Sequence, residues 1–147
     1  MKVSDILRVK GGTLFTVHPD EPLARAVDAM AEKDIGSLVV MDHGRLVGIL
    51  TFREVLAALA TRGGTLGDLR VSQICEHDPL ICAPGLDLTS LRGVMLERHA
   101  RYVPVMSGHT LEGVVSFHDV AKAVYEEQSY ENRMLKSYIG DSPAATA

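Results

Sequence analysis

The sequence has little of what marks a secreted domain, a metalloprotein or a nucleic-acid-binding protein. Its 147 residues include no tryptophan, 5% aromatic residues and two cysteines. Cys75 and Cys82 are too few for a disulfide framework, and their spacing matches no common zinc pattern. The net charge of −4 at pH 7 argues against broad electrostatic binding to DNA or RNA, which needs clustered lysine and arginine. A small anion held by a few local cations and a helix N-terminus remains compatible with this charge.

Long apolar segments are also missing. The N-terminus, Met1 to Ile6, has one early lysine but no apolar stretch of signal-peptide length. No run approaches the roughly 20 apolar residues of a membrane-spanning helix. Hydrophobic residues make up 46% of the chain and charged residues 23%, which is typical of globular proteins. We therefore expect a soluble, cytoplasmic protein with no membrane partner and no nucleic-acid duplex as partner.

The chain contains an internal repeat. A shift that places Pro19 on Pro84 aligns the sequence with itself, without a gap, as far as about Ala60. The apolar pattern agrees almost throughout, and identical residues recur at the pairs Leu23/Leu88, Met30/Met95, Val40/Val105, Gly48/Gly113 and Phe52/Phe117. We predict repeat one over residues 1–62, a glycine-containing linker over 63–70 and repeat two over 71–126. Repeat one carries extra residues around Gly11 and Gly12.

Each repeat begins with the same predicted elements. Ser4 and Ser72 are predicted to cap a short helical turn. Short apolar runs at Leu14–Val17 and Leu80–Cys82 predict an entry strand in each repeat. Apolar residues at helical spacing then predict a helix, with Leu23, Ala26, Val27 and Met30 in repeat one and Leu88, Leu91, Val94 and Met95 in repeat two.

The second part of each repeat predicts a hairpin followed by a helix. In repeat one, Ser37–Met41 and Leu46–Leu50 are the strands, and Asp42-His43-Gly44 is the turn. The helix after Thr51 places Val55, Leu56 and Leu59 on its apolar face. The fold class is therefore α+β, with two tandem β-α-β-β-α units. Because one such sheet leaves a face uncovered, we expect the units to pack pseudo-symmetrically through their sheets.

The C-terminal residues 127–147 are predicted to extend the last helix and then to become a tail. The helical pattern runs from Val120 to Ile139. Pro143 and the residues after it favour disorder. The extended helix is a candidate contact with another subunit.

Two equivalent segments join a predicted strand to a predicted helix and carry a hydroxyl followed three positions later by a carboxylate. These pairs are Thr51 with Glu54 and Ser116 with Asp119. Such spacing is typical of a capping box, in which the side chains and amides of the first helical turn satisfy one another.

The same arrangement also suits a nucleotide. The amides of a helix N-terminus and a hydroxyl can hold a phosphate, and a carboxylate one turn later can accept hydrogen bonds from a ribose diol. Arg53 and His118 occupy equivalent positions in the first turn and can add positive charge. The capping and nucleotide-binding interpretations both stand at this point.

The double unit resembles a pair of CBS domains, named after cystathionine β-synthase and often called a Bateman module. The resemblance runs from about Val3 to Tyr125. Its markers are the two Gly-apolar-apolar-Ser/Thr-x-x-acid segments together with Val3-Ser4-Asp5-Ile6, Thr16-Val17-His18-Pro19 and Tyr102-Val103-Pro104-Val105. This duplicated set in this order is specific. The resemblance implies a non-catalytic regulatory module that binds AMP, ADP, ATP or NAD in two clefts and commonly forms a homodimer, with an unknown regulated protein as partner.

The resemblance also implies which residues line the clefts. The first cleft would use Thr16, Val17, Gly36, Ser37, Leu38, Ser116, His118 and Asp119. The second would use Ile81, Cys82, Arg101, Tyr102, Val103, Pro104, Thr51, Arg53 and Glu54. Glu54 departs from the aspartate that the family most often has, so we expect the first cleft to be the better ribose site.

Three residues have two interpretations each. Arg101 can stack on adenine or pair with a phosphate, or it can be a solvated cation at a strand end. Tyr102 can wall the base or belong to the core edge. Lys10, before a glycine pair, can fold over phosphates, but a plain exposed turn is favoured.

Catalysis and metal binding are not predicted. Ser116 and His118 lie two residues apart at a helix start, so their side chains point in different directions and form no nucleophile–base pair. No Walker or Rossmann glycine pattern is present. No histidine has a second ligand four residues later, so no metal site is predicted. The alternative to nucleotide binding is a dimerisation or protein-interaction module with vestigial clefts.

Overall fold

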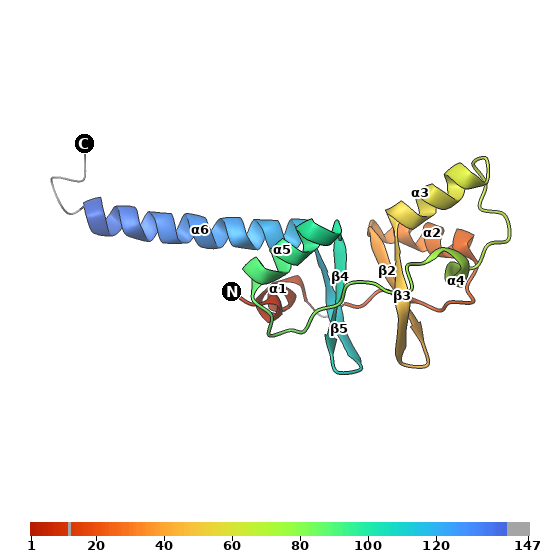
Figure 1. The fold of residues 1–147 in the computed structure, drawn as a ribbon, viewed down its shortest axis with the longest axis horizontal. Helices are drawn as coiled ribbons and strands as arrows, with labels where there is room; N and C mark the ends of the chain where they lie inside the picture. Colours follow the sequence, from red (N-terminus) through yellow and green to blue (C-terminus); the bar gives the residue numbers. More distant parts are fainter. Residues whose placement is uncertain (12, 141–147) are drawn as a thin grey trace.

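The computed structural model describes residues 1–11 and 13–140. Gly12 of the predicted loop and the predicted tail from Pro143 lie outside the described residues. Figure 1 shows two α/β bodies side by side, with the last helix projecting from one of them. The elements in chain order are α1 Val3–Lys10, β1 Thr16–Val17, α2 Leu23–Lys33, β2 Ser37–Asp42, β3 Arg45–Thr51, α3 Phe52–Thr61, α4 Val71–Ile74, α5 Leu88–Arg98, β4 Tyr102–Ser107, β5 Thr110–Ser116 and α6 Phe117–Gly140.

The first body is built on a three-stranded sheet. Strand β1 pairs with β2 in parallel, with Val17 opposite Val40, and β2 pairs with β3 antiparallel. The predicted hairpin is present, and His43 and Gly44 both adopt positive φ, at 49° and 79°. Two such residues in succession form the kind of two-residue turn whose twist matches a β-hairpin. The predicted entry strand is shorter than expected, because only Thr16–Val17 pairs with its neighbour.

The second body repeats the hairpin but not the entry strand. Strands β4 and β5 pair antiparallel. The predicted strand Leu80–Cys82 is wrong, since only an isolated bridge between Cys82 and Val105 remains. Prolines explain the difference: Pro79 and Pro84 bound the segment, and Pro104 beside the bridge has no amide hydrogen to donate.

The leading helices are exchanged between the two bodies. Helix α1 packs into the second body, where Val3 and Ile6 are buried in one cluster with residues of α5, β4, β5 and α6. The short α4 packs into the first body, where Val71 is buried beside Leu23. Backbone hydrogen bonds fix both exchanges, from Val3 N to Leu86 O at 2.9 Å and from Val71 N to Glu21 O at 3.0 Å. Each body therefore contains segments of both repeats.

The two sheets meet through a small apolar cluster. It joins side chains of β2 and β3 to side chains of β4 and β5, and its members are Val39, Met41, Leu46, Met106, Leu111 and Val114. This contact covers the sheet face that a single unit leaves open. The predicted α+β class and the packing of two units through their sheets are confirmed.

Two local predictions are wrong. Ser4 and Ser72 are not caps, because Lys2 and Arg70 occupy the N-cap positions. The helices begin earlier than expected because Lys2 and Arg70 form isolated bridges with the other repeat, and their amides donate to the N3 side chains at 2.8 and 2.7 Å. Among the predicted apolar-face residues, Leu56 is 66% exposed and Val94 is 36% exposed.

Helix α6 continues well beyond the second body, as the helical pattern from Val120 to Ile139 predicts (Figure 1). Val120 and Val124 at its start are buried in the second core. Further along, apolar side chains are exposed at Tyr125, Tyr130, Met134 and Leu135. In the described part of the chain, no helix combines the length and apolar character needed to cross a bilayer.

Candidate functional site

Both hydroxyl–carboxylate pairs form capping boxes. At the start of α3, Thr51 N donates to Glu54 Oε1 at 2.7 Å, and Arg53 N donates to Thr51 Oγ1 at 3.2 Å. At the start of α6, Ser116 N donates to Asp119 Oδ2 at 2.9 Å, and Asp119 N donates to Ser116 Oγ at 3.0 Å. The capping interpretation is therefore correct for both pairs, and any ligand chemistry must coexist with it.

The two carboxylates nevertheless differ in their surroundings. Thr51 Oγ1 donates a further hydrogen bond to Glu54 Oε1 at 2.8 Å, which ties that carboxylate to its own cap. Asp119 Oδ2 instead accepts from Lys10 Nζ at 2.7 Å, and the same ammonium donates to Val114 O at 3.1 Å. Lys10 belongs to α1, so the exchanged helix delivers a cation to the acid of the other repeat. The favoured interpretation of Lys10 as a plain exposed turn is wrong.

The pKa of Asp119 reflects this pairing. Burial acts to raise the pKa of the carboxyl, but the hydrogen bonds from Lys10 and Ser116 outweigh burial and hold the pKa below its ordinary value. Asp119 is consequently a carboxylate, able only to accept hydrogen bonds.

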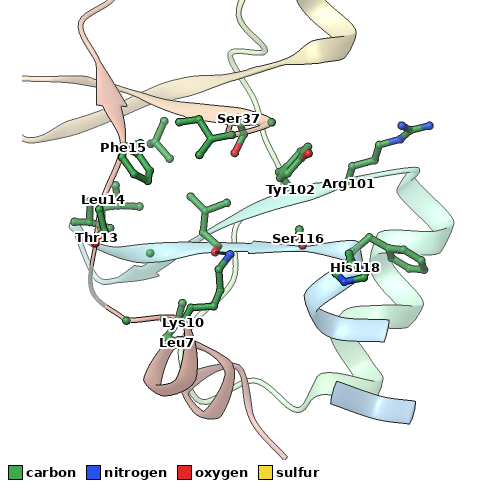
Figure 2. Close-up of a pocket in the computed structure, with 18 residues that line it drawn as sticks. Leu7, Lys10, Thr13, Leu14, Phe15, Ser37, Arg101, Tyr102, Ser116 and His118 are labelled. Atoms are coloured by element: carbon green, nitrogen blue, oxygen red, sulfur yellow. Dashed lines mark hydrogen bonds between the residues drawn. The ribbon is translucent and has the colours of Figure 1, made fainter. Parts of the chain in front are cut away.

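A cavity of about 710 Å³ lies between the two bodies beside this pair, and we name it the Ser116 cleft. Figure 2 shows Lys10 rising from α1 toward Ser116, with Tyr102 on the far wall and Thr13, Leu14 and Phe15 at one end. Its lining residues are Leu7, Lys10, Gly11, Thr13, Leu14, Phe15, Ile35, Gly36, Ser37, Val39, Arg101, Tyr102, Leu111, Gly113, Val114, Ser116, Phe117 and His118. Among the described residues, the lining includes two permanent cations, Lys10 and Arg101, and no carboxylate. A chain of net negative charge thus has a locally positive cavity.

The structure brings together about half of the residues predicted for this cleft. Gly36, Ser37, Ser116 and His118 line it. Asp119 is outside the lining but bonds to two lining residues, Ser116 and Lys10.

Three residues predicted for the Ser116 cleft lie elsewhere. Val17 and Leu38 are buried in the core of the first body, and Thr16 is exposed outside the lining. The residues just before strand β1 line the cleft instead, namely Thr13, Leu14 and Phe15.

A second cavity of about 610 Å³ lies beside the start of α3, and we name it the Thr51 cleft. Five predicted residues line it, namely Thr51, Arg53, Glu54, Arg101 and Tyr102. Sequence reasoning missed further lining residues, among them the cation Arg98 and the acid Glu76. Two carboxylates therefore face this cavity, whereas no described carboxylate lines the Ser116 cleft.

Four residues predicted for the Thr51 cleft do not line it. Cys82 and Val103 belong to the core of the second body. Pro104 is buried, and Ile81 is 48% exposed outside the cavity. Leu80 takes the place of the entry strand in the lining.

Arg101 and Tyr102 line both cavities and so form a wall between them. Tyr102 lies against Gly36 of the first body, where a Cβ atom would overlap the tyrosine hydroxyl and ring and also touch Phe52. Glycine at position 36 is therefore required for the tyrosine to fill this place. Gly36 is the repeat-one counterpart of Arg101, and it has no side chain because Tyr102 packs against it.

Comparison with known proteins agrees with this architecture. The sequence matches the CBS domain family over residues 3–61 and 71–126. The mitochondrial CBS domain-containing protein CBSX3 of Arabidopsis thaliana is 28% identical over 146 residues, which cover 93% of this chain and 71% of that protein. The crystal structure of a CBS-domain containing protein from Agrobacterium tumefaciens is 31% identical, with a TM-score of 0.79, and the match covers 84% of this chain and 98% of that chain.

A third similar protein carries a ligand. The crystal structure of CBSX2 in complex with AMP is 23% identical, with a TM-score of 0.70, and the match covers 86% of this chain and 98% of that chain. At this identity the likeness shows a common fold. Since the family match spans both repeats, the chain belongs to the CBS domain family and carries two CBS domains in tandem.

Proposed function

We propose that this chain is a non-catalytic regulatory module that binds an adenine nucleotide in the Ser116 cleft. One observation carries the proposal: the described lining holds Lys10 and Arg101 and no carboxylate, while Asp119, outside the lining, is bonded to the lining residue Lys10. Anionic phosphates suit the cations, and a ribose diol suits the carboxylate. The similar CBSX2 was crystallised with AMP, which supports an adenine ligand for this fold.

The phosphate is expected at the cations more than at the helix amides. Phe117 N already donates to Arg101 O at 2.7 Å, and Asp119 N donates to Ser116 Oγ. Of the first three amides of α6, only the His118 amide has no protein acceptor among the described residues. One amide is a weak anion site alone, so Lys10 and Arg101 supply most of the attraction.

A ribose can bind Asp119 only if Lys10 shares the carboxylate with it or releases the carboxylate. Asp119 Oδ2 is engaged by Lys10 Nζ at 2.7 Å. A bound nucleotide offers both partners a replacement, since its phosphate can pair with the ammonium while its diol donates to the carboxylate. A nucleoside offers only the diol. Lys10 is therefore expected to favour nucleotides over nucleosides.

The Thr51 cleft is proposed as the weaker site. Glu54 is held by two hydrogen bonds from Thr51, and Glu76 adds a second carboxylate to the lining. Both acids oppose a phosphate, although Arg53, Arg98 and Arg101 are present. We expect one well-occupied site and a second of lower affinity.

The test is a thermal-shift and calorimetric screen with AMP, ADP, ATP and NAD. Adenosine, inorganic phosphate and S-adenosylmethionine, whose tail is cationic, serve as controls. At a nucleotide concentration 100 times Kd, the free energy of unfolding rises by about 2.7 kcal/mol, or roughly 5–10 °C in Tm for a chain of this size. No shift with any nucleotide at millimolar concentration contradicts the proposal. Absorbance of the denatured protein would also reveal co-purified nucleotide.

Matched variants separate ligand binding from helix capping. Asp119→Ala and Glu54→Ala both remove a capping acid, so they should lower stability similarly. Only Asp119→Ala should weaken AMP strongly, because a hydrogen bond to a charged group contributes about 1.5–3 kcal/mol, or roughly ten- to a hundred-fold in Kd. Lys10→Met should weaken AMP but leave adenosine unchanged or tighter. Equal losses for Asp119→Ala and Glu54→Ala would assign Asp119 to capping alone.

Exposed apolar residues on α6 favour a second candidate function, protein interaction through a homodimer. Tyr125, Tyr130, Met134 and Leu135 are each more than half exposed, at 70%, 58%, 54% and 56%. Contact with a second copy would cover them. Sedimentation equilibrium measures the oligomeric state, and Met134→Lys should shift a dimer toward monomer. A monomeric wild-type chain would remove this candidate.

A further inference from the structure

Three side chains with metal-binding atoms converge at the tip of the first hairpin. They come from strand ends and a turn, not from two positions four residues apart on one helix. His18 Nε2 lies 3.1 Å from Asp42 Oδ1, and His43 Nδ1 lies 2.6 Å from the same oxygen. One ligand atom from each of the three residues lies within 4.8 Å of the other two. We infer that His18, Asp42 and His43 form a binding site for a divalent transition-metal ion such as Zn²⁺.

The backbone fixes this meeting of two distant segments. The parallel pairing of β1 with β2 places Val17 opposite Val40, so His18 leaves β1 beside the end of β2, where Asp42 is the last residue. The turn then holds His43 at a φ of 49°, an uncommon conformation outside glycine. Paired strands therefore position all three ligands: Asp42 at the end of β2, His43 in the turn that follows it, and His18 after β1.

The separations suit tetrahedral coordination after small movements. Zinc bonds of about 2.0–2.1 Å to nitrogen and oxygen require ligand atoms roughly 3.3–3.4 Å apart in a tetrahedron. The Asp42–His18 distance of 3.1 Å is close to this value, and the Asp42–His43 distance of 2.6 Å must widen. The two rings, with centroids 6.3 Å apart, are exposed enough to adjust. The ligand atoms of the two histidines lie within 4.8 Å of each other, so these exposed side chains must rotate to bring them closer.

The donor set selects the class of ion. Two imidazole nitrogens and one carboxylate oxygen suit Zn²⁺, Ni²⁺ or Cu²⁺, whereas Mg²⁺ and Ca²⁺ prefer oxygen ligands alone. Three protein ligands leave a fourth position for water. The side chains of His18 and His43 are 47% and 90% exposed, so the ion can enter directly from solvent.

Asp20 supplies an outer partner for His18. Asp20 N donates to His18 Nδ1 at 3.1 Å, so Nδ1 is the acceptor and Nε2 carries the N–H that faces Asp42. Metal binding at Nε2 needs the other tautomer, so the proton leaves Nε2 and Nδ1 takes up a proton from solvent in exchange, with no net release. The carboxylate of Asp20, with Oδ2 3.8 Å from Nδ1, can then accept from it. A carboxylate that accepts from a metal-bound histidine fixes the ring and strengthens the ligand.

The second repeat provides an internal control, because it lacks the ligands. The positions equivalent to His18, Asp42 and His43 are Ala83, Ser107 and Gly108. A single histidine, His109, lies in the second hairpin turn. The proposal therefore requires one ion per chain, bound at the first hairpin.

The experiment is calorimetric titration of the chelator-treated full chain with Zn²⁺, repeated with Co²⁺ to record the absorption spectrum. The expected result is one equivalent of metal and a cobalt spectrum without a thiolate charge-transfer band. His18→Ala and His43→Ala should each weaken Zn²⁺ by at least about ten-fold, the loss typical even of an outer-partner mutation. His109→Ala should leave binding unchanged.

Three results would overturn the inference. Absence of binding would do so, as would equal affinity in the wild type, His18→Ala and His43→Ala. A cobalt–thiolate band would place the ion near Cys75, whose Sγ lies 3.8 Å from His77 Nε2, rather than at the hairpin. Because the substituted histidines are exposed, circular dichroism should show that every variant folds.

Discussion

The exchange of leading helices predicts that a mutation in repeat one loosens the body formed mostly by repeat two. Ile6 of α1 is 6% exposed and packs in the core of the second body. Replacement by alanine removes buried methyl and methylene groups and should lower the free energy of unfolding by about 2–5 kcal/mol. Val9 lies on the same helix but is 88% exposed, so Val9→Ala should change stability by less than about 0.5 kcal/mol.

Hydrogen exchange followed by mass spectrometry locates the effect. In Ile6→Ala, amides of β4, β5 and α5 should exchange faster, because local opening of the second body costs less free energy. Amides of β2 and β3 should change less. The mirror variant, Val71→Ala, removes a buried contact in the first body and should produce the opposite pattern.

Either of two results would contradict this packing of α1. If Ile6→Ala accelerates exchange in β2 and β3 more than in β4 and β5, then α1 packs against its own repeat in solution. If Ile6→Ala and Val9→Ala have equal stability in urea, then α1 is not docked. Either result would also remove Lys10 from the Ser116 cleft.

Three further predictions concern the site and the core. The pKa of Asp119 is below its ordinary value of 3.8, so ionisation of this carboxyl stabilises the fold fully above pH 3.8, and the stabilisation is lost as the pH falls toward the folded pKa. Lys10→Met should reduce this stabilisation by no more than about 1 kcal/mol, because the pair is partly exposed. Urea unfolding of the wild type and the variant from neutral to acidic pH measures the difference. Burial raises the pKa of the Cys82 thiol to about 11, so at pH 8 about one thiol in a thousand is ionised, and a chromogenic disulfide reagent should label it only after unfolding. Gly36→Ala should displace Tyr102, lower stability by about 1–3 kcal/mol and weaken AMP, as urea unfolding and calorimetry would show, whereas unchanged values would mean that the tyrosine moves freely.

Local signals in the sequence predicted the elements well. The turn at His43-Gly44 and the strands beside it depend on neighbouring residues, and the structure has both. The capping boxes at Thr51 and Ser116 are equally local and are formed. Leu80–Cys82 failed as a strand because of Pro79 and Pro84 on either side of it and of Pro104, more than twenty residues away, on the strand it would pair with.

Long-range placement could not be predicted from periodicity. Nothing in the amphipathic pattern of α1 says which body it joins, because an apolar face fits either core. The pairing of Lys10 with Asp119 follows only from that exchange. The meeting of His18 with Asp42 likewise depends on the register of β1 against β2, whereas a search for metal ligands along one helix could not find it. Cleft residues predicted from the motif were displaced where side-chain direction mattered, as at Val17 and Leu38.

The exchanged helices also set the order in which the chain can fold as it is synthesised. The first body lacks Val71 of its core until the linker has been made, and Val3 finds its partners in α6 only when nearly the whole module exists. Contacts between residues so distant in sequence slow folding, because a long loop must close before they form. Neither repeat is expected to fold alone when expressed separately. The smallest part of this chain expected to fold by itself is therefore the pair of repeats.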